Sequence, residues 1–330
     1  MLQLSVVLPT YNRKAQLMKV IEGLEKQTFA KENFEVVVVS DGSTDDTNDY
    51  LSDLSTPLTL KPVFQENQGV AATRNRGVES ASAPLILFID DDVVPHPDLL
   101  KQHIETHEQA GKPNKMIVIG PMLNPPNFAY KPWVEWEQRM LYKQYDAMDR
   151  GDWAPTARQF YTGNCSLHRE YFKQFGGFNA SFKRAEDVEL AYRMADDGAM
   201  FIYNNQAIGY HYASRSYESW KNTPYAYGRN DVIFNNNHGQ SWLVPTIMKE
   251  YGGRNALIRF VNRLCLDRSN LSQFVQTLFF TLAQLAYRLG LKSFYIAGFS
   301  LIFNIRHYQG MSDELGGRQK FFQLLGTAQN

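Results

Sequence analysis

The sequence contains little that would cross-link it. It has two cysteines, Cys165 and Cys265, among 330 residues. Two cysteines in dissimilar contexts provide neither the close spacing of a zinc site nor a framework of disulfides. Their scarcity fits a reducing compartment, and we expect a cytoplasmic protein.

A surplus of charge of either sign is also missing, because 34 Lys and Arg residues balance 34 Asp and Glu residues. Proteins that bind nucleic acid through a broad basic field carry a positive surplus, so we expect no nucleic-acid partner. The N-terminus lacks a basic region followed by a small-residue cleavage site. It has the pattern of a first strand, and we expect no secretory signal.

Apolar runs long enough to span a membrane are absent from the sequence. The two strongest, residues 274–287 and 294–305, fall short of the roughly 20 residues that a spanning helix needs. Apolar residues nevertheless make up 44% of the chain, which is enough for a sizeable core. The length of the chain suggests two domains.

The first part of the chain alternates short apolar runs with helical spacing. The runs predict strands at residues 4–8, 35–39, 58–64 and 85–89, and the spacing predicts helices at 17–24 and 69–80. Strands that alternate with helices indicate a parallel sheet with right-handed crossovers. Further along, the patterns predict a helix at 187–197, strands at 200–203 and 208–212, and mainly helix from 217 onward.

Polar clusters follow three of the predicted strands, at residues 10–13, 41–43 and 90–92. Ligands of open α/β sheets bind beyond the carboxyl ends of the strands. Because three separate strands deliver polar residues to this edge, we expect the functional site there.

Asp90, Asp91 and Asp92 come directly after a predicted buried strand. Adjacent carboxylates repel one another, and such clusters tend to mark functional sites. Oxygen ligands suit Mg²⁺ or Mn²⁺, and Mg²⁺ commonly binds through one or two carboxylates together with substrate phosphates. We therefore expect a cation site that receives a diphosphate; the alternative is a solvated strand end.

Asp41 and Arg74 lie at the same predicted edge, and each has two interpretations. Residues 41–47 form a turn and a capped helix, which leaves Asp41 available to accept a hydrogen bond from a nucleobase imide. Arg74 lies within the helix that starts near Gly69. Its guanidinium would contact a phosphate or fix a carboxylate, unless it is an ordinary surface arginine.

Five motifs occur in order at these strand ends: Pro-Thr-Tyr-Asn at residues 9–12, Asp-Gly-Ser-Thr-Asp at 41–45, Asn-Gln-Gly at 67–69, Ala-Thr-Arg-Asn at 72–75 and Asp-Asp-Asp at 90–92. The ordered set resembles glycosyltransferase family 2 over residues 3–215. The resemblance implies an α/β protein with the GT-A fold, a Rossmann-like nucleotide-diphospho-sugar transferase with a mixed sheet flanked by helices. We expect a catalytic domain at residues 1–215 and a mainly helical C-terminal region at residues 216–330.

The resemblance also implies roles in a donor site. Pro9, Tyr11 and Asp41 would line the nucleobase pocket, and Asp90 and Asp91 would contact ribose and sugar. The other residues of the expected donor site are Asn67, Gly69 and Arg74.

The expected metal ligands are Asp92 and His211. By the resemblance, Asp92 would bind Mn²⁺ or Mg²⁺. His211 lies between two tyrosines and is the best candidate for a further metal ligand or a diphosphate contact; a packed, hydrogen-bonded histidine is the alternative.

Glu186 and Asp187 resemble the family's acidic pair before a helix, which implies that Asp187 is the general base. Inversion at an anomeric carbon needs a group that accepts the proton of the attacking hydroxyl, and a carboxylate near a helix N-terminus stays ionised. The alternative is that both residues cap the helix. Residues 163–166 and 175–178 resemble the segment that shapes the acceptor side. The Gln-x-x-Arg-Trp signature of the family's processive synthases is not found, which favours transfer of a single sugar.

The predicted function is an inverting, metal-dependent glycosyltransferase that uses a nucleotide-diphosphate sugar, with a UDP-sugar favoured. The acceptor would be a saccharide or a lipid-linked hydroxyl in glycan, cell-wall or lipid-linked saccharide biosynthesis. One alternative is a nucleotidyltransferase, which would need a basic glycine-rich loop near the start, and residues 9–14 lack glycine. The other is a non-catalytic scaffold that binds sugar nucleotides.

Residues 271–306 also have two interpretations. They form either a helical bundle packed on the catalytic domain, which could also make a homodimer contact, or a hairpin on a membrane surface near a lipid-linked acceptor. Phe279, Phe280 and Phe294, with basic residues nearby, suit an interfacial element. We favour peripheral association with the inner face of the membrane.

Overall fold

A computed structural model describes residues 2–111 and 114–328. The chain divides into two compact units, one with residues 1–129 and 140–213 and the other with residues 130–139 and 214–330. Helix α5 (Pro132–Asp149) contributes residues to both units. The domain boundary expected between residues 215 and 216 stays a prediction.

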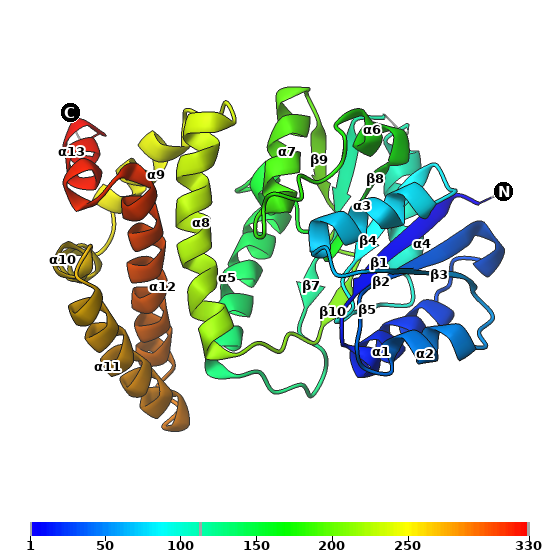
Figure 1. The fold of residues 1–330 in the computed structure, drawn as a ribbon, viewed down its shortest axis with the longest axis horizontal. Coiled ribbons are helices and arrows are strands. Elements are labelled where there is room, and N and C mark those ends of the chain that lie inside the picture. Colours follow the sequence, from blue (N-terminus) through cyan, green and yellow to red (C-terminus); the bar gives the residue numbers. More distant parts are fainter. Residues whose placement is uncertain (1, 112–113, 329–330) are drawn as a thin grey trace. The chain divides into compact units, whose positions relative to one another are not determined.

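The first unit is built on a seven-stranded sheet with the order β3-β2-β1-β4-β8-β6-β9 (Figure 1). Its strands are β1 (Leu4–Thr10), β2 (Phe34–Asp41), β3 (Thr59–Gln65), β4 (Leu85–Ile89), β6 (Met116–Ile119), β8 (Asn164–His168) and β9 (Met200–Tyr203). Strands β1 to β4 pair in parallel, whereas β8 runs antiparallel to β4 and β6. The predicted parallel strands and the mixed sheet implied by the resemblance are therefore both confirmed.

Three central strands are buried along their whole length. Every residue of β1, β2 and β4 is buried, whereas β3, at the edge of the sheet, is largely exposed. A strand that helices cover on both faces cannot alternate polar and apolar residues. This explains the run of four valines at residues 36–39.

Helices and 3₁₀ turns connect the strands of the first unit. They are α1 (Lys14–Glu25), η1 (Lys31–Asn33), α2 (Thr47–Asp53), α3 (Val70–Ser80), α4 (Leu99–Gln109), η2 (Ala157–Gln159), α6 (Arg169–Gln174) and α7 (Glu186–Asp196). Helix α3 packs tightly on the sheet, because a Cβ added at Gly77 would lie 2.4 Å from Cγ1 of Val7. Leu17, Val20 and Leu24 of α1 belong to the core beneath β1 and β2.

A second, three-stranded sheet lies in the same unit. Its strands are β5 (Val93–Pro95), β10 (Gly209–His211) and β7 (Met122–Leu123), in the order β5-β10-β7. In the antiparallel β5–β10 pair, His211 lies opposite Val93. The strand predicted at residues 208–212 is present as β10. Its pairing with β5 places His211 beside the segment that follows Asp92.

The second unit is mainly helical, as predicted for the chain from residue 217. Its helices are α8 (Tyr217–Asn237), α9 (Leu243–Gly252), α10 (Ala256–Cys265), α11 (Ser269–Arg288), α12 (Lys292–Leu315) and α13 (Arg318–Ala328). Helices α8 and α12 approach closely at two glycines. A Cβ added at Gly228 would lie 2.0 Å from the carbonyl oxygen of His307, and one at Gly310 would lie 2.1 Å from that of Tyr225.

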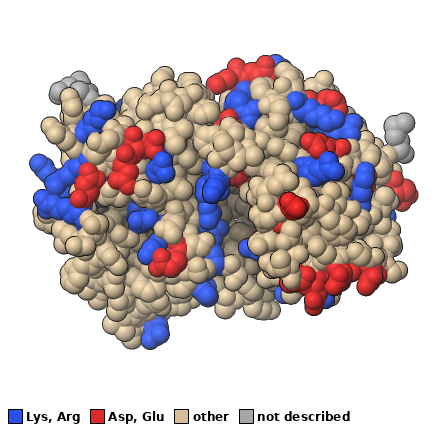
Figure 2. Space-filling model, viewed as in Figure 1, with Lys and Arg blue, Asp and Glu red and all other residues tan. Residues whose placement is uncertain are grey.

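No helix within the described ranges, 2–111 and 114–328, combines the length and the apolar character that crossing a bilayer requires. Basic and acidic side chains are interspersed on the visible face of each unit (Figure 2), as the balanced charge of the chain suggests.

Candidate active site

The ends of β1 and β4 meet through hydrogen bonds between polar side chains, of which Thr10 and Asp91 are buried. The Thr10 hydroxyl donates to Oδ2 of Asp91 over 2.8 Å. Arg13 donates from Nη1 to Oδ1 of Asp91 over 3.0 Å and to Oδ2 of Asp92 over 2.8 Å. The first and third polar clusters therefore form one network, as expected from their positions after neighbouring strands.

Asp91 is held in an environment that disfavours its charge. Burial raises the pKa of Asp91 to about 7, and the neighbouring carboxylates of Asp92 and Asp90 act in the same direction, while Arg13 and Thr10 oppose them. A carboxyl group with this pKa changes its protonation readily when a charged ligand arrives. This behaviour fits a binding site better than a solvated strand end.

The two expected metal ligands lie close together. Nε2 of His211 is 3.6 Å from Oδ1 of Asp92, and both side chains are largely buried. The backbone amide of Tyr212 donates to the carbonyl oxygen of Asp92 over 2.8 Å, so the β5–β10 pair fixes this approach.

A carboxylate and an imidazole suit Mn²⁺, and the carboxylate suits Mg²⁺. Within the part of the chain that the structure describes, no three His, Cys, Asp or Glu side chains are grouped as a metal site. The remaining ligands would have to come from substrate phosphates and water, which is a common arrangement for Mg²⁺. Asp92 and His211 therefore fit a cation that binds together with a diphosphate.

Arg74 connects two acidic segments that are far apart in the sequence. Its side chain is 5% exposed. It donates from Nη2 to Oδ1 of Asp90 over 2.7 Å and from Nη1 to Oε1 of Glu186 over 2.8 Å. Burial alone would lower the pKa of Arg74, but the two carboxylates together raise it. The sequence-based alternative that Arg74 is an ordinary surface arginine is therefore wrong. Arg74 instead holds two carboxylates in place.

Glu186 and Asp187 begin α7 directly after a residue in an unusual conformation. Ala185 has a φ of 61°, in the left-handed region. A non-glycine residue held there costs about 1 kcal/mol or more, and such strain often accompanies function. Glu186 is buried against Arg74, whereas Asp187 is partly exposed and accepts a hydrogen bond from the amide of Val188 over 2.8 Å.

The surroundings of Asp187 disfavour its charge, so the expectation that the helix N-terminus keeps this carboxylate ionised is wrong. Loss of water around its carboxylate raises the pKa of Asp187, and the negative charge of Glu186 raises it further, while Arg74 opposes both. The bond to Val188 shows that Asp187 also satisfies an amide of the first helical turn. The capping interaction is thus present in the structure, and the same carboxylate remains partly exposed.

Asp41 is occupied by its own surroundings. Its side chain accepts hydrogen bonds from Nε2 of Gln65 and from the backbone amides of Gln68 and Gly69, over 2.8, 2.8 and 2.9 Å. Asn67 donates to the carbonyl oxygen of Asp41 over 2.9 Å. The buried Asp41 therefore shapes the turn before α3, and its contact with a nucleobase stays a prediction.

Pro9 is buried within β1, and Tyr11, just after it, is 47% exposed. Sequence reasoning gave no role to the residue that follows. Asn12 has a φ of 53°, and its Oδ1 accepts hydrogen bonds from the amides of Thr44 and Asp45 over 2.7 and 3.3 Å. Asn12 therefore ties the loop after β1 to the loop after β2. Asparagine tolerates the left-handed region of backbone conformation better than most residues. An asparagine directly after a strand is therefore the sequence feature that could have indicated this turn.

The segments expected on the acceptor side serve mainly to hold the fold. Asn75 of α3 exchanges two hydrogen bonds with the backbone of Phe178, over 2.8 and 2.9 Å. Asn164 is fully buried and donates to the carbonyl oxygens of Pro121 and Ala207. A Cβ at Gly163 would lie 2.6 Å from Sδ of Met122 and 3.1 Å from Oδ2 of Asp90, so a side chain would not fit at this position beside the acidic edge.

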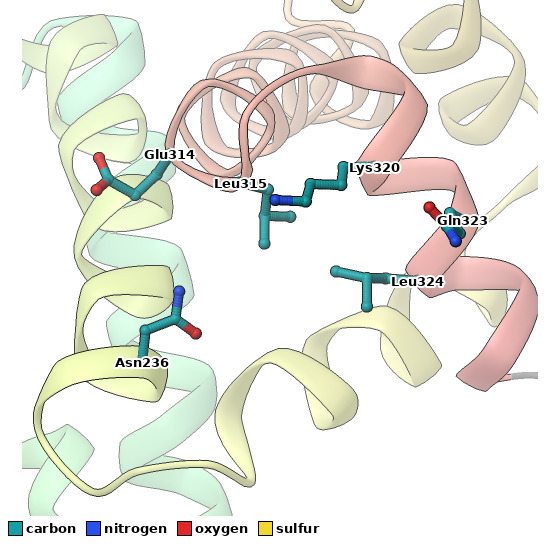
Figure 3. A pocket seen from close by; sticks show the side chains of 6 residues that line it. All are labelled: Asn236, Glu314, Leu315, Lys320, Gln323 and Leu324. Carbon is teal, nitrogen blue, oxygen red and sulfur yellow. The ribbon is translucent and has the colours of Figure 1, made fainter.

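A cavity of about 380 Å³ lies in the helical unit (Figure 3). Its lining comes from α8, α12 and α13 and consists of Asn236, Glu314, Leu315, Lys320, Gln323 and Leu324. It contains none of the residues expected in the active site.

Two solved structures share this fold. The mannosyltransferase PcManGT from Pyrobaculum calidifontis, in complex with GDP-Man and Mn²⁺, gives a TM-score of 0.61 at 18% identity and covers 93% of this chain and 86% of that chain. S. aureus TarS 1-349 in complex with UDP gives 0.56 at 19% identity and covers 93% and 90%. The fold is thus of the GT-A type, with a helical C-terminal region.

The class that this fold and its acidic edge define is that of GT-A glycosyltransferases. The chain belongs to glycosyl transferase family 2, whose model matches residues 5–176. Validoxylamine A glucosyltransferase from Streptomyces hygroscopicus subsp. limoneus is 35% identical over an alignment of 235 residues, which covers 62% of this chain and 51% of that protein. The chain spans about half the length of this relative.

Family membership confirms the expectation of a glycosyltransferase. The alternative of a nucleotidyltransferase has no support from this membership.

Proposed function

We propose that the protein is an inverting, metal-dependent glycosyltransferase that transfers a single sugar from a nucleotide-diphosphate sugar to an acceptor hydroxyl. The observation that carries this proposal is the bridge made by Arg74, which joins Asp90 at the end of β4 to Glu186 beside Asp187. One ion-pair network thereby connects the expected donor edge with the expected base. A displacement reaction needs both at one reacting centre.

The donor would bind along residues 90–92. Asp90 and Asp91 would contact ribose and sugar, while Asp92 and His211 would hold Mn²⁺ or Mg²⁺. A divalent cation bound there would reduce the repulsion between a diphosphate and the carboxylates and stabilise the charge of the departing diphosphate. Solved structures of the same fold were obtained with GDP-Man and Mn²⁺ and with UDP, which supports this class of donor. We favour a UDP-sugar.

The nucleobase would bind beside the ends of β1 and β2. The half-exposed ring of Tyr11, two residues after Pro9, offers a face for stacking. Asp41, Asn67 and Gly69 form the neighbouring turn. That turn would present backbone groups to the nucleoside.

Asp187 would accept the proton of the attacking hydroxyl. Its raised pKa makes it a stronger base than an ordinary aspartate. Glu186 would act on Asp187 without touching the substrate, because Arg74 holds it in place and its charge contributes to the shift. A single displacement assisted by one base inverts the anomeric carbon.

The acceptor would be a saccharide or a lipid-linked hydroxyl in glycan, cell-wall or lipid-linked saccharide biosynthesis. The glucosyltransferase named above supports a hexose as the transferred group. We place the enzyme in the cytoplasm, peripherally bound to the inner face of the membrane. Residues 1–215 would form the catalytic domain and residues 216–330 the helical region that associates with the membrane.

The test is a panel of UDP-, GDP- and dTDP-sugars incubated with the purified protein and Mn²⁺. Release of nucleoside diphosphate reports slow hydrolysis of the donor, and calorimetry reports binding. We expect one donor to be hydrolysed and its binding to require the metal. Asp187→Asn should abolish hydrolysis and retain binding of the nucleoside diphosphate. Equal loss of both activities would remove Asp187 as the base, and binding without turnover of any donor would favour the non-catalytic scaffold.

A further inference from the structure

Helix α11 exposes a continuous stripe of large apolar side chains. The stripe consists of Leu271, Phe274, Leu278, Leu282, Leu285 and Leu289, each between 37% and 65% exposed. At about 100° per residue these six positions fall within an arc of roughly 80° on the helix. They therefore form one face and are not scattered singly over the surface.

Helix α11 is apolar on its packed face as well as on its exposed stripe. Its most buried residues are Ser272, Gln276, Ala283 and Ala286. On the same side Phe279 packs on the small cluster between α10 and α12, and Phe280 stacks on Tyr217 of α8. The sequence-based expectation that Phe279 and Phe280 lie at a membrane interface is therefore wrong. Helices of soluble proteins normally bury their apolar stripe and expose polar residues. The helix already has an apolar face that packs within the helical unit, so the second, exposed stripe indicates a contact outside the chain.

The apolar surface continues onto the elements on either side of α11. Leu257, Phe260 and Leu264 of α10 are 55%, 61% and 38% exposed, and Leu291 and Phe294, where α11 joins α12, are 47% and 71% exposed. The opposite side of α10 packs on α12 through a small buried cluster. We call the eleven exposed residues of α10, α11 and this turn the apolar hairpin face.

The charge around this face differs in sign from the rest of the chain. Residues 254–294 contain six basic residues, all exposed: Arg254, Arg259, Arg263, Arg268, Arg288 and Lys292. They contain one acidic residue, Asp267, which accepts hydrogen bonds from Gln309, Ser312 and the amide of Arg318. The remainder of the chain has 28 basic and 33 acidic residues.

The basic residues border the apolar stripe. In Figure 2 the surface over α11 is largely uncharged, with Lys and Arg side chains toward the α10 end and at the tip where α11 joins α12. Arg259 and Arg288 form no ion pair with an acidic residue anywhere in ranges 2–111 and 114–328. Their charge is therefore available to an external anion.

We propose that residues 254–294 form a docking surface for an anionic lipid bilayer, with the apolar hairpin face in the interfacial layer and the basic side chains against the headgroups. An element with these properties lies in the plane of the interface. A second copy of the chain fits less well, because face-to-face pairing would bring six basic residues of each copy together without acidic partners. This proposal rests on the peripheral association proposed above. It names the surface that would bind the membrane and the kind of lipid that would be bound.

The test is co-sedimentation of the full chain with two kinds of vesicle, one of pure phosphatidylcholine and one with phosphatidylglycerol added. We expect binding to the anionic vesicles to be at least tenfold tighter and to weaken with salt. Phe274→Ser with Leu278→Ser should weaken it at least tenfold. Arg259→Glu with Arg288→Glu should remove the preference for phosphatidylglycerol. Met200→Ser, at a 47% exposed position of the other unit, and Arg150→Glu are the matched controls and should bind as the parent does.

Three results would overturn the proposal. The first is that the parent protein does not bind anionic vesicles. The second is that the parent and both hairpin variants bind them equally. The third is that light scattering shows a dimer which Leu278→Ser dissociates. The last would assign the face to a second copy. Donor hydrolysis, measured without vesicles, reports separately on the transferase site, so failure of one proposal is distinguishable from failure of the other.

Discussion

Arg74 forms ion pairs with Asp90 and Glu186. We expect that removing the Arg74 guanidinium will lower the free energy of unfolding substantially. In Arg74→Met, a side chain of similar length replaces the guanidinium and leaves both carboxylates without it. Breaking a buried ion pair from one side costs about 3–5 kcal/mol, and this range applies to Glu186, whose side chain is 9% exposed. Asp90 is 35% exposed, so water screens it and it adds at most about 1 kcal/mol. We expect a loss of about 4 kcal/mol.

The assay is urea denaturation followed by tryptophan fluorescence, with donor hydrolysis measured on the same preparations. Arg76→Met is the control, because Arg76 lies on the same helix and pairs with Glu79 at an exposed position; it should change stability by less than about 0.5 kcal/mol. A double-mutant cycle isolates the bridge. Adding Glu186→Gln to Arg74→Met removes the uncompensated charge and should recover about 1–3 kcal/mol. Additive losses would refute the view that Arg74 and Glu186 stabilise each other.

Three further predictions follow from the geometry. Because loss of water and the charge of Glu186 raise the pKa of Asp187 to about 7, and only the ionised form accepts a proton, kcat/KM should rise with pH through about 7 and then level. Glu186→Gln should shift that limb to lower pH; an unchanged profile would exclude Asp187 as the titrating base. His211→Ala should raise the Mn²⁺ concentration for half-maximal activity about tenfold or more, and an unchanged metal requirement would remove His211 as a ligand. Gly228→Ala should lower the free energy of unfolding by about 1–3 kcal/mol, since its methyl group would lie 2.0 Å from a carbonyl oxygen of α12. Gly253→Ala, with no atom closer than 3.5 Å, should be nearly neutral in the same urea denaturation.

The sheet was predictable because its signals are local. The valines of β2 report burial on both faces, and the polar residues after β1, β2 and β4 report the edge where the chain turns. Such patterns depend on the strand itself and not on its distant neighbours. The same reasoning correctly placed Asp90, Asp91 and Asp92 at the end of a buried strand.

Contacts between distant segments were not predictable from periodicity. Whether Arg74 is exposed or buried depends on Glu186, which is 112 residues away along the chain. The approach of His211 to Asp92 depends on the pairing of β5 with β10. The apolar run in α11 was visible in the sequence, but which of its faces packs on α12 is decided by the neighbouring helix.

Helix α3 explains how the two sides of the expected reaction are held in register. Asp41 accepts the amides at its start, Arg74 in its second turn binds Asp90 and Glu186, and Asn75 binds the backbone of the segment that leads to α7. Gly77 seats the same helix against β1 without room for a methyl group. Because one rigid element contacts both the donor edge and the base segment, a displacement of α3 would move both together. Substitutions that shift α3 should therefore reduce donor binding and proton transfer in parallel, whereas Asp187→Asn should separate them.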